Sequence, residues 1–186
     1  NLVYRTRESV HIWYGNENTT WINNIFVNGL KTQINYTNAT DTDHVNIRFL
    51  QNIVCWQDAE ATLFVISGDH SLPEESDYNV YYQTGGAEMR IDRLPGIENY
   101  QQWLARGFDA HSTVADPLFV DPANDDYTLQ PDSPALKLGF QPLDMSTVGL
   151  RGSTTGSGTV SGAPRPRSRS RRSAHRAWSR SCRRRC

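Results

Sequence analysis

The feature that most constrains the fold is the recurrence of one short motif. The stretches "NNIFVN", "QNIVCW" and "YNVYYQ" each place an asparagine before alternating apolar residues, and these are Asn24, Asn52 and Asn79, at intervals of 28 and 27 residues. Period-two alternation with β-branched and aromatic residues predicts a short strand after each asparagine. A strand-based unit of this length cannot bury its apolar face alone, which indicates a stacked solenoid.

Further strand-like stretches lie between the copies, "VNIRF" at 45–49 and "TLFVI" at 62–66, so each repeat holds more than one strand. In a parallel β-helix, equivalent residues of successive coils stack at about 4.8 Å. A side-chain amide both donates and accepts, so stacked asparagines can bond each other and the turn backbone. The alternative is a chance recurrence, because asparagine is common in turns. We predict that residues 1–92 are the last coils of a parallel β-helix.

Residues 93–150 are predicted to form a C-terminal cap, because an open solenoid end exposes strand edges and apolar core. "GIENYQQWLARG" predicts a short amphipathic helix that ends at Gly107, and "DSPALKLG" predicts a helical turn with Ser133 as N-cap. Asp109 and His111 are interpreted as packing or capping groups of this region. Nothing comparable caps the start, and the chain begins at Asn1 rather than Met, so we expect a fragment that lacks upstream coils.

The charge of the chain is divided between two segments. Residues 1–150 hold 8 basic and 20 acidic residues, a net charge of −12, whereas residues 151–186 hold 11 arginines and no acidic residue. An acidic domain disfavours nucleic acid and anionic membranes as partners. No apolar run approaches the roughly 20 residues of a membrane span. We therefore predict neither nucleic acid nor a membrane as partner of the folded part.

The last segment, residues 151–186, is predicted to be disordered, because it is poor in apolar residues and has no periodicity. One interpretation is a cationic arm that binds nucleic acid. The one we favour is a frameshift artefact, since GC-rich DNA read out of frame yields Arg, Ser, Ala, Gly and Pro.

The three cysteines form no disulfide framework, and Cys182 and Cys186 lack the partners of a zinc site. Cys55, in "NIVCW", is interpreted as a small core residue. We predict no metal and no cofactor.

Longer stretches of the chain resemble one family. "HIWYGNENTTWINNIFVNG", "TDHVNIRFLQNIV", "SDYNVYY" and above all "QQWLARGFDAHSTVADPLFVDPANDDYTLQPDSPALKLGFQPLD" resemble the C-terminal part of secreted bacterial β-helix proteins, the glycoside hydrolase family 141-like proteins of the pectate-lyase-like superfamily. The resemblance covers about residues 1–150. It implies a right-handed parallel β-helix, a secreted or periplasmic location, and carbohydrate chemistry.

Glycoside cleavage usually needs two carboxyl groups across a substrate groove. Asp43 and His44, in "TDTDHVN", match an acidic-His pair of the family at this place. Asp69 lies beside His70 in a loop between coils, and Asp77 precedes the last repeat strand. The candidate catalytic residues are therefore Asp43, His44, Asp69 and Asp77. The alternatives are a solvated acidic turn for the first pair and, for Asp77, hydrogen bonds to neighbouring backbone amides.

The candidate substrate-binding residues come from aromatic and histidine positions. "HIWYG" resembles a family stretch that reads His-x-His-Tyr-Gly, with Trp13 at the second His position, which leaves His11 and Tyr14 as possible sugar contacts. Exposed Trp and Tyr side chains stack on sugar rings. Trp13, Trp56 and Tyr82 are candidates for this role, with core packing as the alternative for each.

The leading hypothesis is a monomeric carbohydrate-active enzyme, a glycoside hydrolase that acts on cell-wall polysaccharide and is represented here by its C-terminal part. The alternatives are a non-catalytic, glycan-binding or adhesin-like β-helix and a polysaccharide lyase. Hydrolysis requires Asp43 and either Asp69 or Asp77 to line one groove, with carboxyl groups roughly 5–10 Å apart. Binding of nucleic acid through the arginine-rich tail ranks last.

Overall fold

The structure, a computed structural model, describes residues 1–13, 15–37 and 43–144. The strands are β1 (Leu2–Tyr4), β2 (Glu8–Ile12), β3 (Thr20–Ile22), β4 (Ile25–Val27), β5 (Thr32–Tyr36), β6 (Arg48–Leu50), β7 (Ile53–Trp56), β8 (Thr62–Ile66), β9 (Glu75–Asp77), β10 (Val80–Gln83), β11 (Arg90–Leu94), β12 (Ile97–Asn99), β13 (Thr113–Val114), β14 (Phe119–Asp121) and β15 (Asp126–Leu129). The helical segments are α1 (Tyr100–Ala105), α2 (Pro134–Lys137) and the 3-10 turns η1 (Asp69–Ser71) and η2 (Pro122–Asn124). The predicted disorder of residues 151–186 falls outside the described residues.

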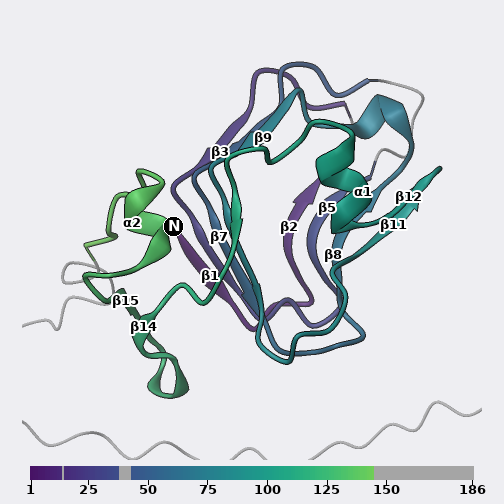
Figure 1. Ribbon diagram of the computed structural model, residues 1–186. Helices are drawn as coiled ribbons and strands as arrows, with labels where there is room; N and C mark the ends of the chain where they lie inside the picture. The colour runs from purple at the N-terminus through teal and green to yellow at the C-terminus, as the bar shows by residue number, and fades with distance from the viewer. Residues whose placement is uncertain (14, 38–42, 145–186) are drawn as a thin grey trace, which may run out of the picture. The chain divides into compact units, whose positions relative to one another are not determined.

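The strands of the coils form three sheets, which are the faces of the β-helix in Figure 1, and β14 and β15 form a separate two-stranded antiparallel sheet. The first sheet has the order β1-β4-β7-β10-β13, the second β12-β11-β8-β5-β2, and the third β3-β6-β9. Each of the first three coils contributes one strand to each sheet, and strands of successive coils pair in parallel; Ile25, for example, stands opposite Ile53, which stands opposite Val80. The predicted parallel β-helix is confirmed.

The strands of the first sheet are apolar on both faces because both faces are covered. Phe26, Val54 and Tyr81 point into the interior of the coil, together with aromatic rings of the other sheets; the Phe26 and Phe49 rings, for example, stack 6.0 Å apart. Ile25 and Ile53 point outward and pack under the C-terminal cap. The core therefore consists of the coil interior and a second apolar layer outside the first sheet.

A ladder of asparagines runs along the corner between the third and first sheets. Nδ2 of Asn24 donates to Oδ1 of Asn52 at 2.9 Å, and Nδ2 of Asn52 donates to Oδ1 of Asn79 at 3.3 Å. The same oxygens accept backbone N–H groups, that of Asn24 at 3.0 Å and that of Asn52 at 2.8 Å. The Asn1 side chain extends the ladder by one step at 2.9 Å. The predicted stacking of these amides is confirmed.

The corner is tight because the residue before each ladder asparagine adopts a left-handed backbone conformation. Asn23, Gln51 and Tyr78 have φ values of 59°, 51° and 58°. This conformation is strained for residues other than glycine, so the surrounding hydrogen bonds must hold it in place. The ladder supplies those bonds at every coil.

Asp109 ends the ladder at the capped end of the helix. Its Oδ1 accepts from Nδ2 of Asn79 at 2.9 Å, and its Oδ2 accepts from Nε1 of Trp103 at 2.7 Å. The hydroxyls of Ser76, Tyr81 and Ser112 complete its shell at 3.0, 3.1 and 2.6 Å. Burial raises the pKa of this carboxyl, although these hydrogen bonds oppose the shift. The interpretation of Asp109 as a capping group is confirmed.

The predicted helix at 96–107 is shorter than its pattern indicated. Residues Ile97–Asn99 are strand β12, which pairs antiparallel with β11, and helix α1 begins at Tyr100 with the Asn99 side chain as its N-cap. The reason is the turn at Gly96, whose φ of 76° returns the chain along β11 and pairs Ile97 with Leu94. Trp103 of α1 is fully buried and closes the core.

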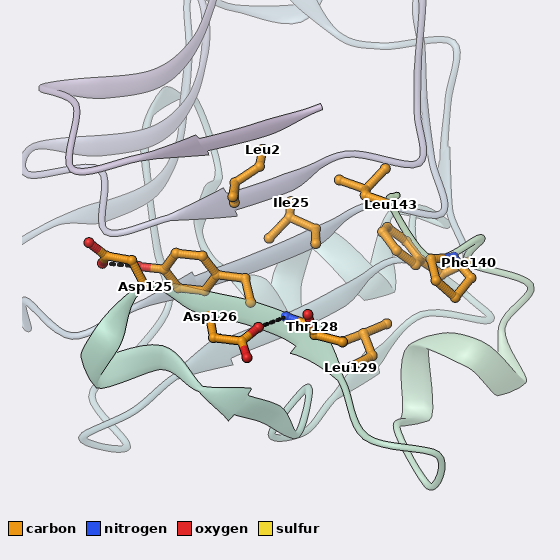
Figure 2. A pocket seen from close by; sticks show the side chains of 10 residues that line it. Leu2, Ile25, Asp125, Asp126, Thr128, Leu129, Phe140 and Leu143 are labelled. Atoms are coloured by element: carbon orange, nitrogen blue, oxygen red, sulfur yellow. Dashed lines mark hydrogen bonds between the residues drawn. The ribbon is translucent and has the colours of Figure 1, made fainter. Parts of the chain in front are cut away.

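The second part of the cap covers the outer face of the first sheet. Phe119, Tyr127 and Phe140 pack against outward residues of β4, β7 and β10. Figure 2 shows the opening that remains beside this contact, an apolar pocket of about 140 Å³ between Leu2 and Ile25 on one side and Leu129 and Phe140 on the other. Ser133 caps α2, as predicted, by accepting the Ala135 backbone N–H.

Candidate functional site

A groove of about 420 Å³ crosses the outer face of the second sheet. Its floor is built from rows of side chains that strand pairing brings into register. One row is Glu8, Thr32 and Thr62, and the next is His11, Asn35, Val65 and Asp92, on β2, β5, β8 and β11. Thr37 and Ser67, which directly follow β5 and β8, line the same groove. Val10, Ile34 and Phe64 each precede a residue of the second row by one position, so strand alternation turns them the other way, into the core.

Three groove residues form a continuous hydrogen-bonded chain. Oε2 of Glu8 lies 3.1 Å from Nδ1 of His11, and Nε2 of His11 lies 3.1 Å from Oγ1 of Thr37. An ionised carboxylate only accepts, so Nδ1 carries a proton and, in the neutral imidazole, Nε2 accepts from the Thr37 hydroxyl. Nδ2 of Asn35 donates to the same oxygen of Glu8 at 3.0 Å. Glu8 thereby fixes both the tautomer and the orientation of His11.

Trp13 stands at the rim of the groove with 40 % of its surface exposed. Its ring meets the His11 ring edge-on, with centroids 4.6 Å apart and an interplanar angle of 65°. Two of the predicted substrate-binding residues, His11 and Trp13, therefore lie together in this groove. Another of them, Tyr14, lies outside the described residues.

The charges of the groove balance. Three cationic and three anionic side chains line it, namely Lys31, Arg90, Arg93, Glu8, Glu60 and Asp92. Arg90 pairs with the exposed Glu60 at 3.8 Å. The other polar lining groups are four hydroxyls, the Asn35 amide and the His11 imidazole. This combination suits a polar ligand of low net charge.

The predicted catalytic residues Asp43, His44 and Asp69 lie at a different place, the corner that leads from the second sheet to the third. The backbone N–H of His44 donates to the His70 carbonyl at 2.9 Å, which stacks the two segments on successive coils. Asp43 is exposed there. Asp69, in η1, is also exposed and accepts from Nη2 of Arg106 at 2.8 Å. None of these residues lines the groove.

His44 is held as a buried neutral ring. Its Nδ1 accepts a hydrogen bond from the Asn16 backbone N–H at 3.1 Å, and only 8 % of the surface of His44 is exposed. Burial lowers the pKa of His44, and the nearby His70 lowers it further. The hydrogen bond between Asn16 and His44 therefore links two adjacent coils at this corner.

Asp77, at the end of β9, lies at the opposite end of the third sheet from Asp69, which precedes β9. Its carboxylate accepts from the backbone N–H groups of Tyr78 and His111 at 2.8 and 2.7 Å, and its Oδ2 lies 2.6 Å from Nδ1 of His111. Burial alone raises the pKa of Asp77, but these hydrogen bonds outweigh it and bring the pKa below its usual value. The structure therefore does not bring Asp77 to the carboxylates at the other corner.

Trp56 is buried to 1 % exposure in the coil interior, so it has no surface to offer a sugar ring. Strand alternation explains this placement, because Trp56 points to the same side of β7 as Val54. Tyr82 is half-buried on the outer side of the first sheet, away from the groove. Cys55 is a core residue, as predicted, and burial raises the pKa of its thiol to about 12, with a further contribution from Asp116.

Sequence reasoning missed several groove residues, among them Glu8, Asn35, Thr37 and Asp92. What could have indicated them is the polar residue type at the outward-facing positions of the second-sheet strands. That signal is readable only when the register between the strands is known, and the spacing of this sheet is uneven: Glu8 to Thr32 is 24 residues, but Thr32 to Thr62 is 30.

The fold and the groove define this chain as a parallel β-helix protein with a polar surface groove. Comparisons with protein-family models, curated proteins and solved structures found no match. Among residues 1–13, 15–37 and 43–144, no three His, Cys, Asp or Glu side chains gather in a way that could hold a metal ion. In the same part of the chain, no helix has the length and apolar character needed to cross a membrane.

Proposed function

We propose that the chain is part of a carbohydrate-active β-helix protein and that it binds an oligosaccharide or polysaccharide segment in the groove of the second sheet. The observation that carries this proposal is the combination of an exposed aromatic ring at the rim with a floor of hydroxyl and amide side chains from stacked strands. Sugar hydroxyls need many donors and acceptors, and the C–H face of a sugar ring packs on an aromatic surface.

The shape of the floor supports an elongated ligand. Successive coils place side chains at the strand spacing of about 4.8 Å, so His11, Asn35 and Asp92 present hydrogen-bonding groups along a line that crosses four strands, with the apolar Val65 between Asn35 and Asp92. The balanced charge of the lining favours a neutral or weakly charged glycan over a polyphosphate, which would require a net positive groove.

Replacing Trp13 by alanine is expected to weaken glycan binding about tenfold, a loss of about 1.4 kcal/mol. The reason is the loss of the stacking surface at the groove rim. The measurement is isothermal titration against a panel of plant and algal cell-wall oligosaccharides. Tyr78→Ala is the matched control, because Tyr78 has the same 40 % exposure but stacks on His111, away from the groove. Equal affinities of the two variants would remove the groove as the binding site.

A second candidate function, glycoside hydrolysis, is favoured by two carboxylates on the groove floor. Glu8 contacts Asn35 and so places its carboxylate level with β5, while Asp92 lies two strands further on β11. Two strand spacings amount to roughly 10 Å. Inverting glycosidases hold their carboxyl groups about 6.5–9.5 Å apart, so inclination of either side chain reaches that range.

Under this second candidate, Asp92→Asn is expected to reduce polysaccharide cleavage by about 10²–10⁴-fold, since a general acid or base is lost. The release of reducing ends from the same panel measures it. Asp43→Ala belongs in the same assay, because the family resemblance assigns Asp43 to catalysis: unchanged cleavage would reject that assignment. Full cleavage by Asp92→Asn would reject the groove as the hydrolytic centre.

A further inference from the structure

We propose that Glu8, His11 and Thr37 form an acyl-transfer centre that removes O-acyl groups from a sugar held in the groove. The choice of an acylated sugar as substrate rests on the proposed glycan binding, whereas the acyl-transfer chemistry rests on the three side chains alone. They are arranged as carboxylate, imidazole and hydroxyl in a line, with both intervening distances 3.1 Å. This is the arrangement by which an imidazole activates a hydroxyl nucleophile.

Each member is held by the fold. Glu8 and His11 lie three residues apart on β2, and the strand pairing places His11 opposite Asn35 on β5. Thr37 follows the last residue of β5, so its hydroxyl comes from the neighbouring coil, 26 residues from His11 in the sequence. Asn35 donates to Glu8, and Trp13 packs against the His11 ring. The imidazole is thus positioned on three sides.

The first half of the reaction forms an acyl-enzyme. Oγ1 of Thr37 attacks the carbonyl carbon of the ester, and its proton passes to Nε2 of His11. Glu8 stabilises the imidazolium without taking its proton. When the tetrahedral intermediate collapses, the bond between the carbonyl carbon and the sugar oxygen breaks. His11 returns the proton to that oxygen, which leaves as a sugar hydroxyl, and the acyl group stays on Thr37 as an ester.

The second half consumes one water molecule. His11 takes a proton from the water as the water oxygen attacks the acyl carbon, and the bond to Oγ1 of Thr37 breaks. The proton passes to Oγ1, so the products are the free carboxylic acid and the original enzyme. No oxidant, reductant or metal is required. In both halves negative charge develops on the carbonyl oxygen.

Two groove residues beyond Thr37 are placed to offset that charge. Ser67 lies on the next coil, where its backbone N–H donates to the Tyr36 carbonyl at 3.2 Å, and its side chain lines the groove. Arg93 lines the groove on the coil after that. A hydroxyl donor and a guanidinium are both groups that stabilise an oxyanion.

If the three residues had a purely structural role, the Thr37 hydroxyl would serve only to link β2 to the end of β5 through its hydrogen bond with His11. The two roles differ in what they require of residue 37. A structural link is lost whenever the hydrogen bond to His11 weakens, and a smaller residue at position 37 would not strengthen it. A nucleophile needs the hydroxyl and is hindered by the threonine methyl group, because that β-branch crowds the attacking oxygen.

The test uses the whole chain with p-nitrophenyl acetate as probe, and the variants Thr37→Val, Thr37→Ser, His11→Ala and Glu8→Gln. Thr37→Val is expected to lose at least about 100-fold in turnover, His11→Ala a similar factor, and Glu8→Gln at least about tenfold. Thr37→Ser is expected to be at least as fast as the unmodified protein. Intact mass spectrometry after a short reaction is expected to find one added acetyl group, located at residue 37 by peptide mapping.

His111→Ala is the matched control, because His111 also pairs with a carboxylate, Asp77 at 2.6 Å, but lies outside the groove. It measures the background of an exposed imidazole, and its turnover is expected to stay unchanged. Turnover by Thr37→Val equal to that of the unmodified protein overturns the proposal, as does an acetyl group found only elsewhere. Circular dichroism melts that match for Thr37→Val and Thr37→Ser ensure that the comparison is between folded proteins.

The outcome separates this centre from the proposed glycan binding. Probe hydrolysis that depends on Thr37 without any glycan binding would retain the acyl-transfer centre and reject the carbohydrate substrate. Glycan binding without Thr37-dependent hydrolysis would reject the centre alone.

Discussion

Asp109→Ala is expected to destabilise the domain by about 3–5 kcal/mol, the cost of leaving buried polar groups without their charged partner. The carboxylate accepts from five side chains, and Trp103, Asn79 and Tyr81 among them are almost completely buried. Since single domains are stable by about 5–15 kcal/mol, this loss takes a large share of the total. Urea denaturation followed by tryptophan fluorescence measures it directly, because Trp103 lies against Asp109.

The control for this change is Asp126→Ala. Asp126 is an exposed carboxylate of the cap whose contact is the neighbouring Thr128 backbone N–H at 3.0 Å, so its removal is expected to leave the denaturation midpoint unchanged. If the two variants unfold at the same urea concentration, Asp109 does not hold the cap to the coils. The contrast matters for function, because the same cap closes the end of the sheets that carry the groove.

The ladder could be predicted from the sequence because its residues stack directly. Each ladder asparagine is followed at once by a strand of the first sheet, and the short corner allows no insertion between them. The interval between successive asparagines therefore equals the length of one coil, and the periodicity of the sequence reports the periodicity of the structure. Asp109 does not belong to this pattern: it lies four residues before β13, and it is interpreted as a packing or capping group because it falls in the predicted cap.

The groove could not be predicted in the same way, because the segments between the second and third sheets differ in length: about seven residues separate β2 from β3, and about eleven separate β5 from β6. The step from His11 to Asn35 is 24 residues, and the step from Asn35 to Val65 is 30. Without the register, Glu8 and Thr37 are two unrelated polar residues. Only the assembled coil shows that they meet at His11.

Two of the carboxylates selected from the sequence have the chemistry that hydrolysis requires, but in the fold they make structural contacts and do not line the groove. Asp77 receives two backbone N–H groups and the His111 ring, which is the alternative that its position before a strand had left open. Asp69 pairs with Arg106. That a residue is next to a strand in the sequence does not show which of the three sheets it lies beside. The sheets that the neighbouring strands join decide this, and they are known only once the coil is assembled.

Asn52→Asp is expected to destabilise the domain by about 3–5 kcal/mol, although it changes only one side-chain group. Nδ2 of Asn52 donates to the Trp21 carbonyl at 2.8 Å and to Oδ1 of Asn79 at 3.3 Å. In the variant, a carboxylate oxygen would face two acceptors inside a corner where Asn52 has 1 % of its surface exposed. The buried carboxyl must either remain charged without a partner or take up a proton, and both cost free energy of folding.

The matched control is Asn46→Asp, because the chain contains a second, exposed asparagine step. Nδ2 of Asn46 donates to Oδ1 of Asn18 at 2.9 Å, over the same sequence separation of 28 residues as between Asn24 and Asn52. Both residues of the exposed step have a left-handed backbone, which aspartate tolerates as asparagine does. Since water solvates the new carboxylate, its cost is expected to stay below about 1 kcal/mol.

Chemical denaturation of the two variants, measured at neutral pH and again near pH 4, separates burial from sequence position. The destabilisation by Asn52→Asp is expected to shrink at the lower pH, because protonation removes the buried charge and restores one donor. The Asn46→Asp variant is expected to change little between the two conditions. Equal losses in the two variants would mean that the buried ladder contributes no more than an exposed turn. In that case the periodic asparagines would record the geometry of the corner rather than the interaction that stabilises it.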